Sequence, residues 1–74
     1  MYKSQDIANR IKERAETQGV VLKIMLIDAG LGRNTMSNFK TSMPKADNLA
    51  KIADRLNCSI DYLMGRTDKP EINK

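Results

Sequence analysis

Apolar side chains recur every three or four residues along most of this 74-residue chain, and no long run alternates apolar with polar residues. That spacing is typical of amphipathic helices, each of which buries one face. Four series carry the spacing, namely Ile7, Ala8, Ile11 and Ala15; Leu22, Met25, Leu26 and Ala29; Met36 and Phe39; and Leu49, Ile52, Ala53 and Leu56. The pattern therefore predicts an all-α fold, and the length allows one compact domain.

Capping residues and glycines set the expected ends of five helices. Ser4 is expected to cap the first helix, and Ser59 the short fifth one. Gly19, Gly30 and Gly65 are expected to end the first, second and fifth helices. The expected helices cover residues 5–18, 22–29, 33 to 40 or 41, 46–57 and 60–64. We assign residues 1–66 to the domain and 67–74 to a polar tail, and expect the polar segment after residue 65 to fray or to act as an arm toward a partner.

The residue types that this chain lacks exclude several functions. It has no histidine, which is the commonest general base and metal ligand, and its single cysteine, Cys58, has no partner for a disulfide. No glycine-rich phosphate loop is present, and no apolar run approaches the length of a membrane span. We therefore expect no enzyme activity, no cofactor, no metal site and no membrane association. Cys58 is expected to be a small buried apolar residue, with a redox sensor as the alternative.

The positive charge is concentrated in one segment. The chain carries 13 basic and 9 acidic residues, and three of the four excess charges lie within residues 33–45. Those charges are Arg33, Lys40 and Lys45, and no acid occurs from Ala29 to Ala46. A basic segment without acids is suited to a polyanion, because each neutralised phosphate releases a counterion. A basic but functionally neutral surface is the alternative interpretation.

The expected second and third helices are joined by a turn of three to four residues that contains glycine. This is the layout of a helix-turn-helix, whose second helix enters the major groove of DNA. Burial of Met36 and Phe39 would leave the opposite face of the third helix free. Arg33 and Asn34 stand at its beginning, where arginine can bond guanine and asparagine can bond adenine, each through two hydrogen bonds.

The stretch from Ile7 to Asp68 resembles the phage-repressor/Cro-type (Xre) helix-turn-helix family. The residues that carry the resemblance are Leu26, Gly30, the segment 33–38, Pro44, Leu49, Ile52, Ala53, Leu56 and the segment 59–68. The resemblance implies a compact five-helix lambda-repressor-like DNA-binding domain, with its helix-turn-helix at helices 2 and 3. This sequence departs from the family at three positions. The family often has a Ser or Thr cap where this chain has Val21, and a Gln where it has Leu22. Gly32, at the position that caps the third helix, is a weaker cap than Ser or Thr.

Carried over by position, the resemblance assigns two sets of DNA contacts. The base readers are Arg33, Asn34, Ser37 and Asn38. The backbone contacts are Lys23, Thr35, Lys40, Thr41 and Lys45. Thr35 and Ser37 are suited to either role, and Lys23 would replace the glutamine that is missing at the start of the second helix.

These assignments predict a sequence-specific transcriptional regulator, acting as a repressor on a partly palindromic operator. The expected partners are double-stranded DNA and a second copy of the chain, at least on DNA. No small-molecule ligand is expected, and the expected location is the cytoplasm, at the nucleoid. The alternative is a protein-interaction module of the same fold, such as an antitoxin or the partner of an anti-repressor. A dimer seam is one interpretation of Tyr62, Leu63, Met64 and Ile72, and a place in the core is an equal alternative for Tyr62 and Leu63.

Overall fold

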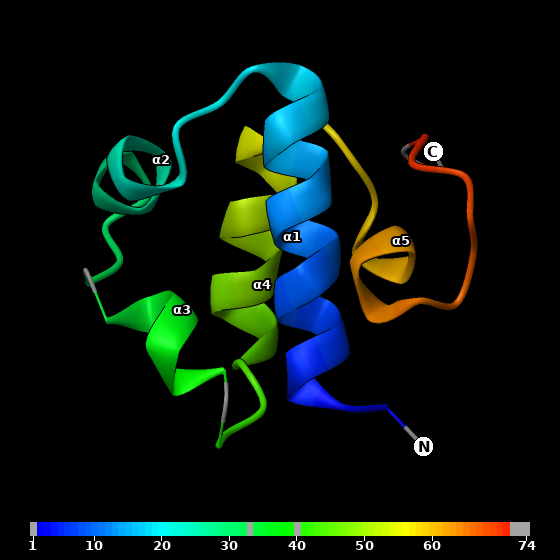
Figure 1. The fold of residues 1–74 in the computed structure, drawn as a ribbon, viewed down its shortest axis with the longest axis horizontal. Helices are drawn as coiled ribbons and strands as arrows, with labels where there is room; N and C mark the ends of the chain where they lie inside the picture. The colour runs from blue at the N-terminus through cyan, green and yellow to red at the C-terminus, as the bar shows by residue number, and fades with distance from the viewer. Residues whose placement is uncertain (1, 33, 40, 72–74) are drawn as a thin grey trace.

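The computed structural model describes residues 2–32, 34–39 and 41–71. Within these ranges the chain forms helices and no strand, which confirms the predicted all-α fold. The helices are α1 (Ser4–Gln18), α2 (Leu22–Asp28), α3 (Thr35–Asn38), α4 (Ala46–Arg55) and α5 (Ile60–Met64). In Figure 1, α1 and α4 occupy the middle of the molecule, with α2 and α3 on one side and α5 on the other. No helix in the described ranges is long and apolar enough to cross a membrane.

The apolar stripes of α1, α2, α4 and α5 meet in one core. Ile11, Ile52, Leu56 and Leu63 are each 0% exposed, so all contact with water is lost at these positions. The remaining members of the core are Ile7, Ala8, Ala15, Met25, Leu26, Phe39, Leu49, Ala53 and Cys58. Met36, Tyr62 and Met64 are partly buried against this core, and fully buried Leu63 belongs to it. No polar or charged side chain is buried within the described residues.

Cys58 is buried in this core, with 2% of its surface exposed. Removal from water raises the pKa of its thiol, although the nearby Arg14 guanidinium opposes the shift. We expect an aromatic disulfide reagent to modify Cys58 slowly in the folded protein and rapidly in guanidinium. Because the unfolded chain ionises this thiol at a lower pH, the free energy of unfolding should fall as the pH rises above about 8.5. Equal labelling rates with and without denaturant would contradict the buried position.

The beginning of α1 differs from the prediction. Ser4 lies inside the helix, and Lys3 is the N-cap, without a side-chain hydrogen bond. The Lys3 carbonyl accepts hydrogen bonds from the backbone N–H groups of Asp6 and Ile7, at 3.1 and 3.2 Å. The expected Ser4 cap is therefore wrong, because the first turn of α1 starts one residue earlier than the capping rule suggested.

α4 ends earlier than predicted, whereas α5 has the predicted bounds. α4 ends at Arg55 instead of Asn57, because Asn57 takes a left-handed conformation with φ 53°. α5 has the predicted bounds: the Ser59 hydroxyl accepts a hydrogen bond from the Tyr62 N–H at 3.0 Å, and Gly65 ends the helix with φ 81°. A residue with a positive φ thus marks each end, namely Asn57 directly after Leu56, the C-cap of α4, and Gly65, the C-cap of α5.

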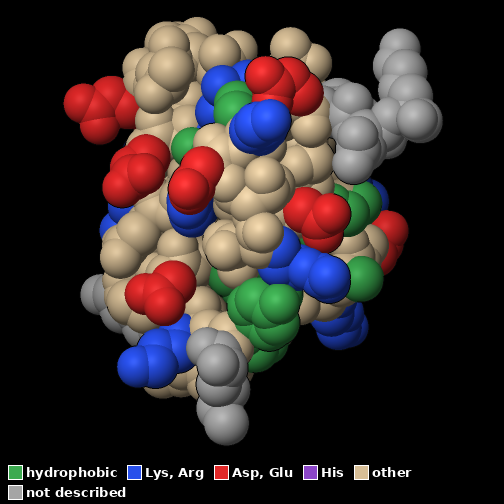
Figure 2. Space-filling model, turned by 90° about the vertical axis from the view of Figure 1, so that its right-hand side faces the viewer, with side chains coloured by type: hydrophobic (Ala, Val, Ile, Leu, Met, Phe, Trp, Pro, Cys, Tyr) green, Lys and Arg blue, Asp and Glu red, His purple; other side chains and the backbone are tan. Residues whose placement is uncertain are grey.

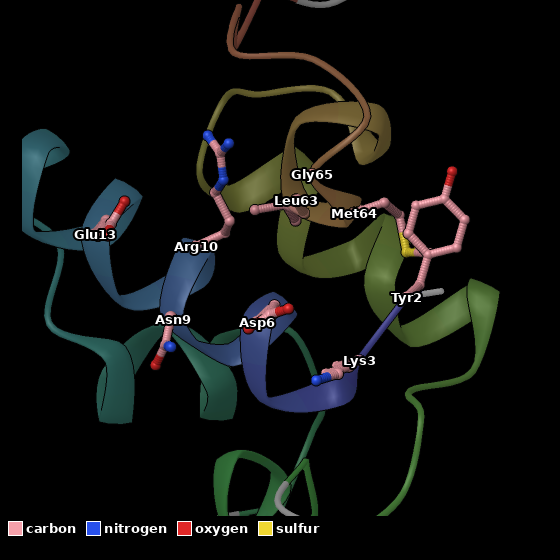
Figure 3. A pocket seen from close by; sticks show the side chains of 9 residues that line it. All are labelled: Tyr2, Lys3, Asp6, Asn9, Arg10, Glu13, Leu63, Met64 and Gly65. Atoms are coloured by element: carbon pink, nitrogen blue, oxygen red, sulfur yellow. The ribbon is translucent and has the colours of Figure 1, made fainter.

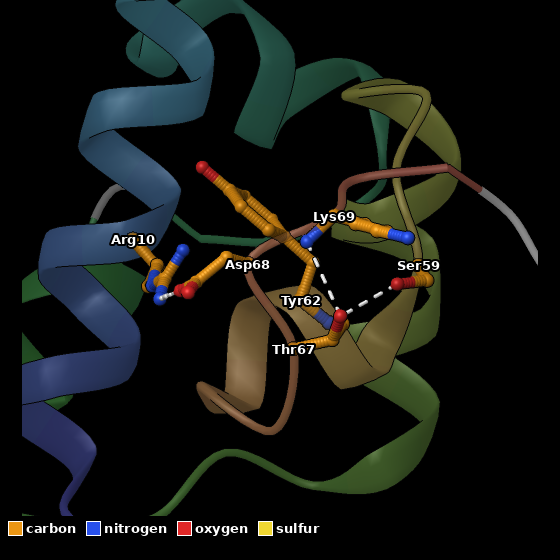
Figure 4. Close-up of polar contacts among 6 residues, drawn as sticks. All are labelled: Arg10, Ser59, Tyr62, Thr67, Asp68 and Lys69. Carbon is orange, nitrogen blue, oxygen red and sulfur yellow. Dashed lines mark hydrogen bonds and ion pairs between the residues drawn. The ribbon is translucent and has the colours of Figure 1, made fainter.

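The segment after α5 folds back onto the domain. The Ser59 N–H donates to the Pro70 carbonyl at 2.9 Å, and the Arg10 guanidinium pairs with Asp68 at 3.0 Å. The same guanidinium lies 4.7 Å from the centre of the Tyr62 ring, and its pKa is raised by its hydrogen bond to Asp68. Figure 4 shows this contact between α1 and the C-terminal segment. The expectation of a frayed segment is therefore wrong as far as Pro70, and the domain boundary at residue 66 stays a prediction.

Candidate nucleic-acid interface

A segment of six residues, 29–34, separates α2 from α3. It is longer than the three to four residues expected, because α2 ends at Asp28 and α3 begins at Thr35. Gly30 has φ 77°, a left-handed conformation that glycine adopts without strain, and the next N–H, of Leu31, donates to the Leu26 carbonyl at 2.8 Å. The predicted arrangement of a helix, a glycine-containing turn and a second helix is therefore present.

α3 is a single turn of helix, shorter than the expected span from 33 to 40 or 41. Its beginning is fixed by Thr35, whose N–H and hydroxyl both donate to the Gly32 carbonyl, at 3.2 and 2.6 Å. Asn34 is the N-cap and makes no side-chain capping bond. After α3, the Asn38 carbonyl accepts from the Ser42 N–H at 2.9 Å. The short helix is explained by its small apolar stripe, since packing supplies most of the stability of a helix in a protein.

Phe39 attaches this segment to the core. None of the four residues of α3 is buried, whereas Phe39, its C-cap, is 3% exposed. Met36 lies partly buried against the same core. The side chains of Met36 and Phe39 therefore attach the α3 segment to the core. Its polar side chains remain on the surface.

Most of the predicted DNA contacts lie on the surface. Among the described base readers, Asn34, Ser37 and Asn38 are exposed. Among the described backbone contacts, Lys23, Thr41 and Lys45 are exposed and Thr35 is half-buried. Arg33 and Lys40 lie outside the described residues. No described candidate is thus fully buried in the fold.

Three of the predicted contacts, Thr35, Asn38 and Lys45, line one surface pocket of about 230 Å³. Ser42 and Asn48 line it too, and sequence reasoning missed both of them. Asn48 could have been suspected, because it lies in the first turn of α4, shortly after the loop that holds Pro44. The pocket is otherwise walled by Phe39, Met43 and Pro44.

The lining of this pocket suits a polyanion. Its polar groups are hydroxyls, amides and one ammonium, and no carboxylate lines it. Hydroxyl, amide and ammonium groups are the side chains that donate hydrogen bonds to phosphate oxygens. The nearest acid in the sequence, Asp47, pairs with Lys51 at 3.5 Å along α4. Because the Thr35 hydroxyl already donates to the Gly32 carbonyl, the donors that the pocket offers are those of Asn38, Ser42, Lys45 and Asn48, with no carboxylate in the wall.

The side of the molecule opposite α3 carries charges of both signs. A pocket of about 620 Å³ lies there between the beginning of α1 and α5, and Figure 3 shows its lining. Asp6 and Glu13 line it together with Lys3 and Arg10, so its charges are of both signs. Figure 2, which views this side, shows acidic and basic side chains interspersed over the surface. This face therefore lacks the uniform charge that would attract a polyanion.

The described part of the chain holds no cluster of potential metal ligands. Among residues 2–32, 34–39 and 41–71, no three His, Cys, Asp or Glu side chains lie together in a way that could hold a metal ion. The one cysteine is buried in the apolar core.

The fold and this surface define the chain as a five-helix domain with a helix-turn-helix arrangement at α2 and α3. The chain is similar to the HTH-type transcriptional regulator ImmR of Bacillus subtilis (strain 168), with 29% identity over 70 residues. The match covers 92% of this chain and 55% of ImmR, so the chain spans about half the length of this relative. No family model and no solved structure matches the chain.

Proposed function

We propose that this chain is a sequence-specific DNA-binding transcriptional regulator of the phage-repressor/Cro type, acting as a repressor. The observation that carries the proposal is the surface pocket beside α3, whose polar lining consists of hydroxyls, amides and one ammonium without a carboxylate, in a helix-turn-helix arrangement. The similarity to ImmR supports it, because that protein's name describes an HTH-type transcriptional regulator. The protein acts by occupying its operator and needs no cofactor, no small-molecule ligand and no chemical step.

In this proposal the α3 segment enters the major groove, where base edges are distinguishable. Arg33, Asn34, Ser37 and Asn38 contact bases. The backbone contacts are Lys23, Thr35, Lys40, Thr41 and Lys45, joined by Ser42 and Asn48 from the pocket lining. The base contacts provide specificity, and the phosphate contacts fix the position of the domain on the duplex.

Two copies are needed to read a partly palindromic operator. A two-fold pair places the two α3 segments about 34 Å apart, one turn of B-DNA. Each copy contacts one half-site, so the symmetry of the operator follows the symmetry of the protein pair. The protein acts in the cytoplasm, at the nucleoid.

Selection of bound sequences from a random duplex pool tests this proposal. The selection is made at about 150 mM salt, where long-range attraction between exposed charges is screened. We expect a two-fold motif whose half-site spacing gives the geometry of the pair. Recovery of no motif by folded protein would overturn the proposal and favour a protein-interaction module of the same fold.

Replacing Lys45 with alanine tests the phosphate contacts. We expect weaker binding to all duplexes by a similar factor, and a salt dependence whose slope falls by about one unit. The measurement is a titration of labelled duplex at several salt concentrations. Lys69→Ala is the matched control, because Lys69 is an exposed lysine of the C-terminal segment. Figure 1 shows that this segment and α3 lie on opposite sides of the molecule. A loss of binding confined to one duplex sequence would instead indicate that Lys45 contacts a base.

A further inference from the structure

Met43 is an exposed methionine in the loop between α3 and α4. Its side chain is 48% exposed, and among the described residues from 29 to 46 no other large apolar side chain is exposed. A single exposed apolar residue is ordinary in a protein. The position of Met43 is the informative observation, because it lines the pocket of about 230 Å³ whose polar groups are suited to a phosphate.

Two backbone hydrogen bonds keep Met43 close to the end of α3. The N–H groups of Thr41 and Ser42 both donate to the Asn38 carbonyl, at 3.1 and 2.9 Å, so Ser42 and the next residue stay near the last residue of the helix. Asn38 and Met43 consequently line the same pocket. Asn38 is one of the proposed base contacts, so Met43 lies beside a group that faces the base edges in the proposed complex.

The pocket combines two kinds of group that one nucleotide can satisfy. Ser42 and Lys45 offer a hydroxyl and an ammonium to phosphate oxygens, and Met43, between them in the sequence, offers an apolar side chain. In the major groove thymine presents a C5-methyl group, the only methyl group among the four bases. That methyl group lies on the side of the base nearest to its own 5′ phosphate. An apolar side chain between phosphate donors therefore matches thymine better than it matches the other bases.

We propose that this pocket takes a thymine nucleotide of the operator, with Met43 against the C5-methyl group and with Ser42 and Lys45 at the 5′ phosphate. The proposal rests on the proposed function, because it names a base that the same site reads. The unbranched methionine side chain has three rotatable bonds, so it can adapt its shape to cover a methyl group. Met43 thus adds an apolar contact to base readers that are all polar, namely Arg33, Asn34, Ser37 and Asn38.

Replacing single thymines of the selected operator with deoxyuridine tests this contact, because deoxyuridine keeps the base pair and lacks only the methyl group. We expect one thymine position in each half-site at which the wild type loses about three- to fivefold in affinity, the effect of one buried methyl group. Met43→Ala should bind the operator more weakly and lose no further affinity at that position, whereas Met43→Leu should keep the sensitivity. Ile60→Ala is the matched control and should behave as the wild type, since Ile60 is an apolar residue of α5 that is 39% exposed.

A neutral methylphosphonate at the 5′ phosphate of the same thymine tests whether both contacts belong to one nucleotide. It should weaken binding by the wild type more than binding by Lys45→Ala, and an equal effect on both would overturn this arrangement. If Met43→Ala were as sensitive to deoxyuridine as the wild type at every position, or if the operator held no fixed thymine, Met43 would not contact a methyl group, although the protein would still read an operator. Recovery of no operator would overturn the proposed function and this proposal together.

Discussion

Replacing Phe39 with alanine is expected to lower the free energy of unfolding by about 3–5 kcal/mol, the usual cost of removing a buried aromatic ring. Phe39 is 3% exposed and belongs to the core, whereas no residue of α3 is buried. A chain of 74 residues has a total stability of about 4–11 kcal/mol, so the loss is a large part of it. The measurement is urea unfolding followed by circular dichroism.

Two further variants show whether this loss comes from the anchoring of α3. Met43→Ala removes an apolar side chain that is 48% exposed in the same region, and should change the stability by less than about 0.5 kcal/mol. Phe39→Leu keeps an apolar group in the core and should lose less stability than Phe39→Ala. If Phe39→Ala and Met43→Ala were equally stable, the ring would not hold α3 to the core.

The helices whose buried face could be predicted are those with a strong apolar stripe. α4 shows why: Leu49, Ile52 and Ala53 are spaced for one face, and all three are buried. α5 is short, but Ser59 and Gly65 mark its two ends, and the structure uses both of them as predicted. Local sequence determines these elements because periodicity and capping are themselves local properties.

The features that could not be predicted depend on contacts between distant residues or on weak local signals. Arg10 and Asp68 are 58 positions apart, so no local pattern indicates that the C-terminal segment folds back. The α3 segment has only Met36 and its C-cap Phe39 at helical spacing, too few apolar residues to fix where the helix begins and ends. In α2 the apolar residues occupy more than one face, and the sequence does not show that Ile24 and Ile27 point away from the core.

The residues of the candidate site stay a prediction made from charge and from the resemblance, and the structure shows which of the described ones are exposed. The acid-free segment and the glycine turn led to the α3 region, where the exposed Asn34, Ser37 and Asn38 now lie. Ser42 and Asn48 were missed because they join the site through the pocket between α3 and α4. A neutral polar residue outside the expected recognition helix carries no charge signal, so its place at the site becomes visible only in the fold.

Replacing Arg33 with alanine is expected to weaken binding to the selected operator by about 1–3 kcal/mol and to relax the preference for one base. The physical reason is the planar guanidinium, which donates two hydrogen bonds to a single guanine edge. Arg33 lies outside the described residues, so the prediction rests on its chemistry and on its position directly after the glycine turn. The measurement is a titration of the operator and of duplexes with each single base replaced.

Arg33→Lys separates base reading from simple attraction. Lysine keeps the positive charge but lacks the planar pair of donors, so this variant should retain the salt dependence and lose much of the base preference. If both variants bound the operator and its substituted forms as the wild type does, Arg33 would not be a base reader. If Arg33→Lys bound as the wild type and Arg33→Ala weakened all duplexes alike, Arg33 would be a phosphate contact. In both of these cases specificity would have to come from the exposed side chains of Asn34, Ser37 and Asn38.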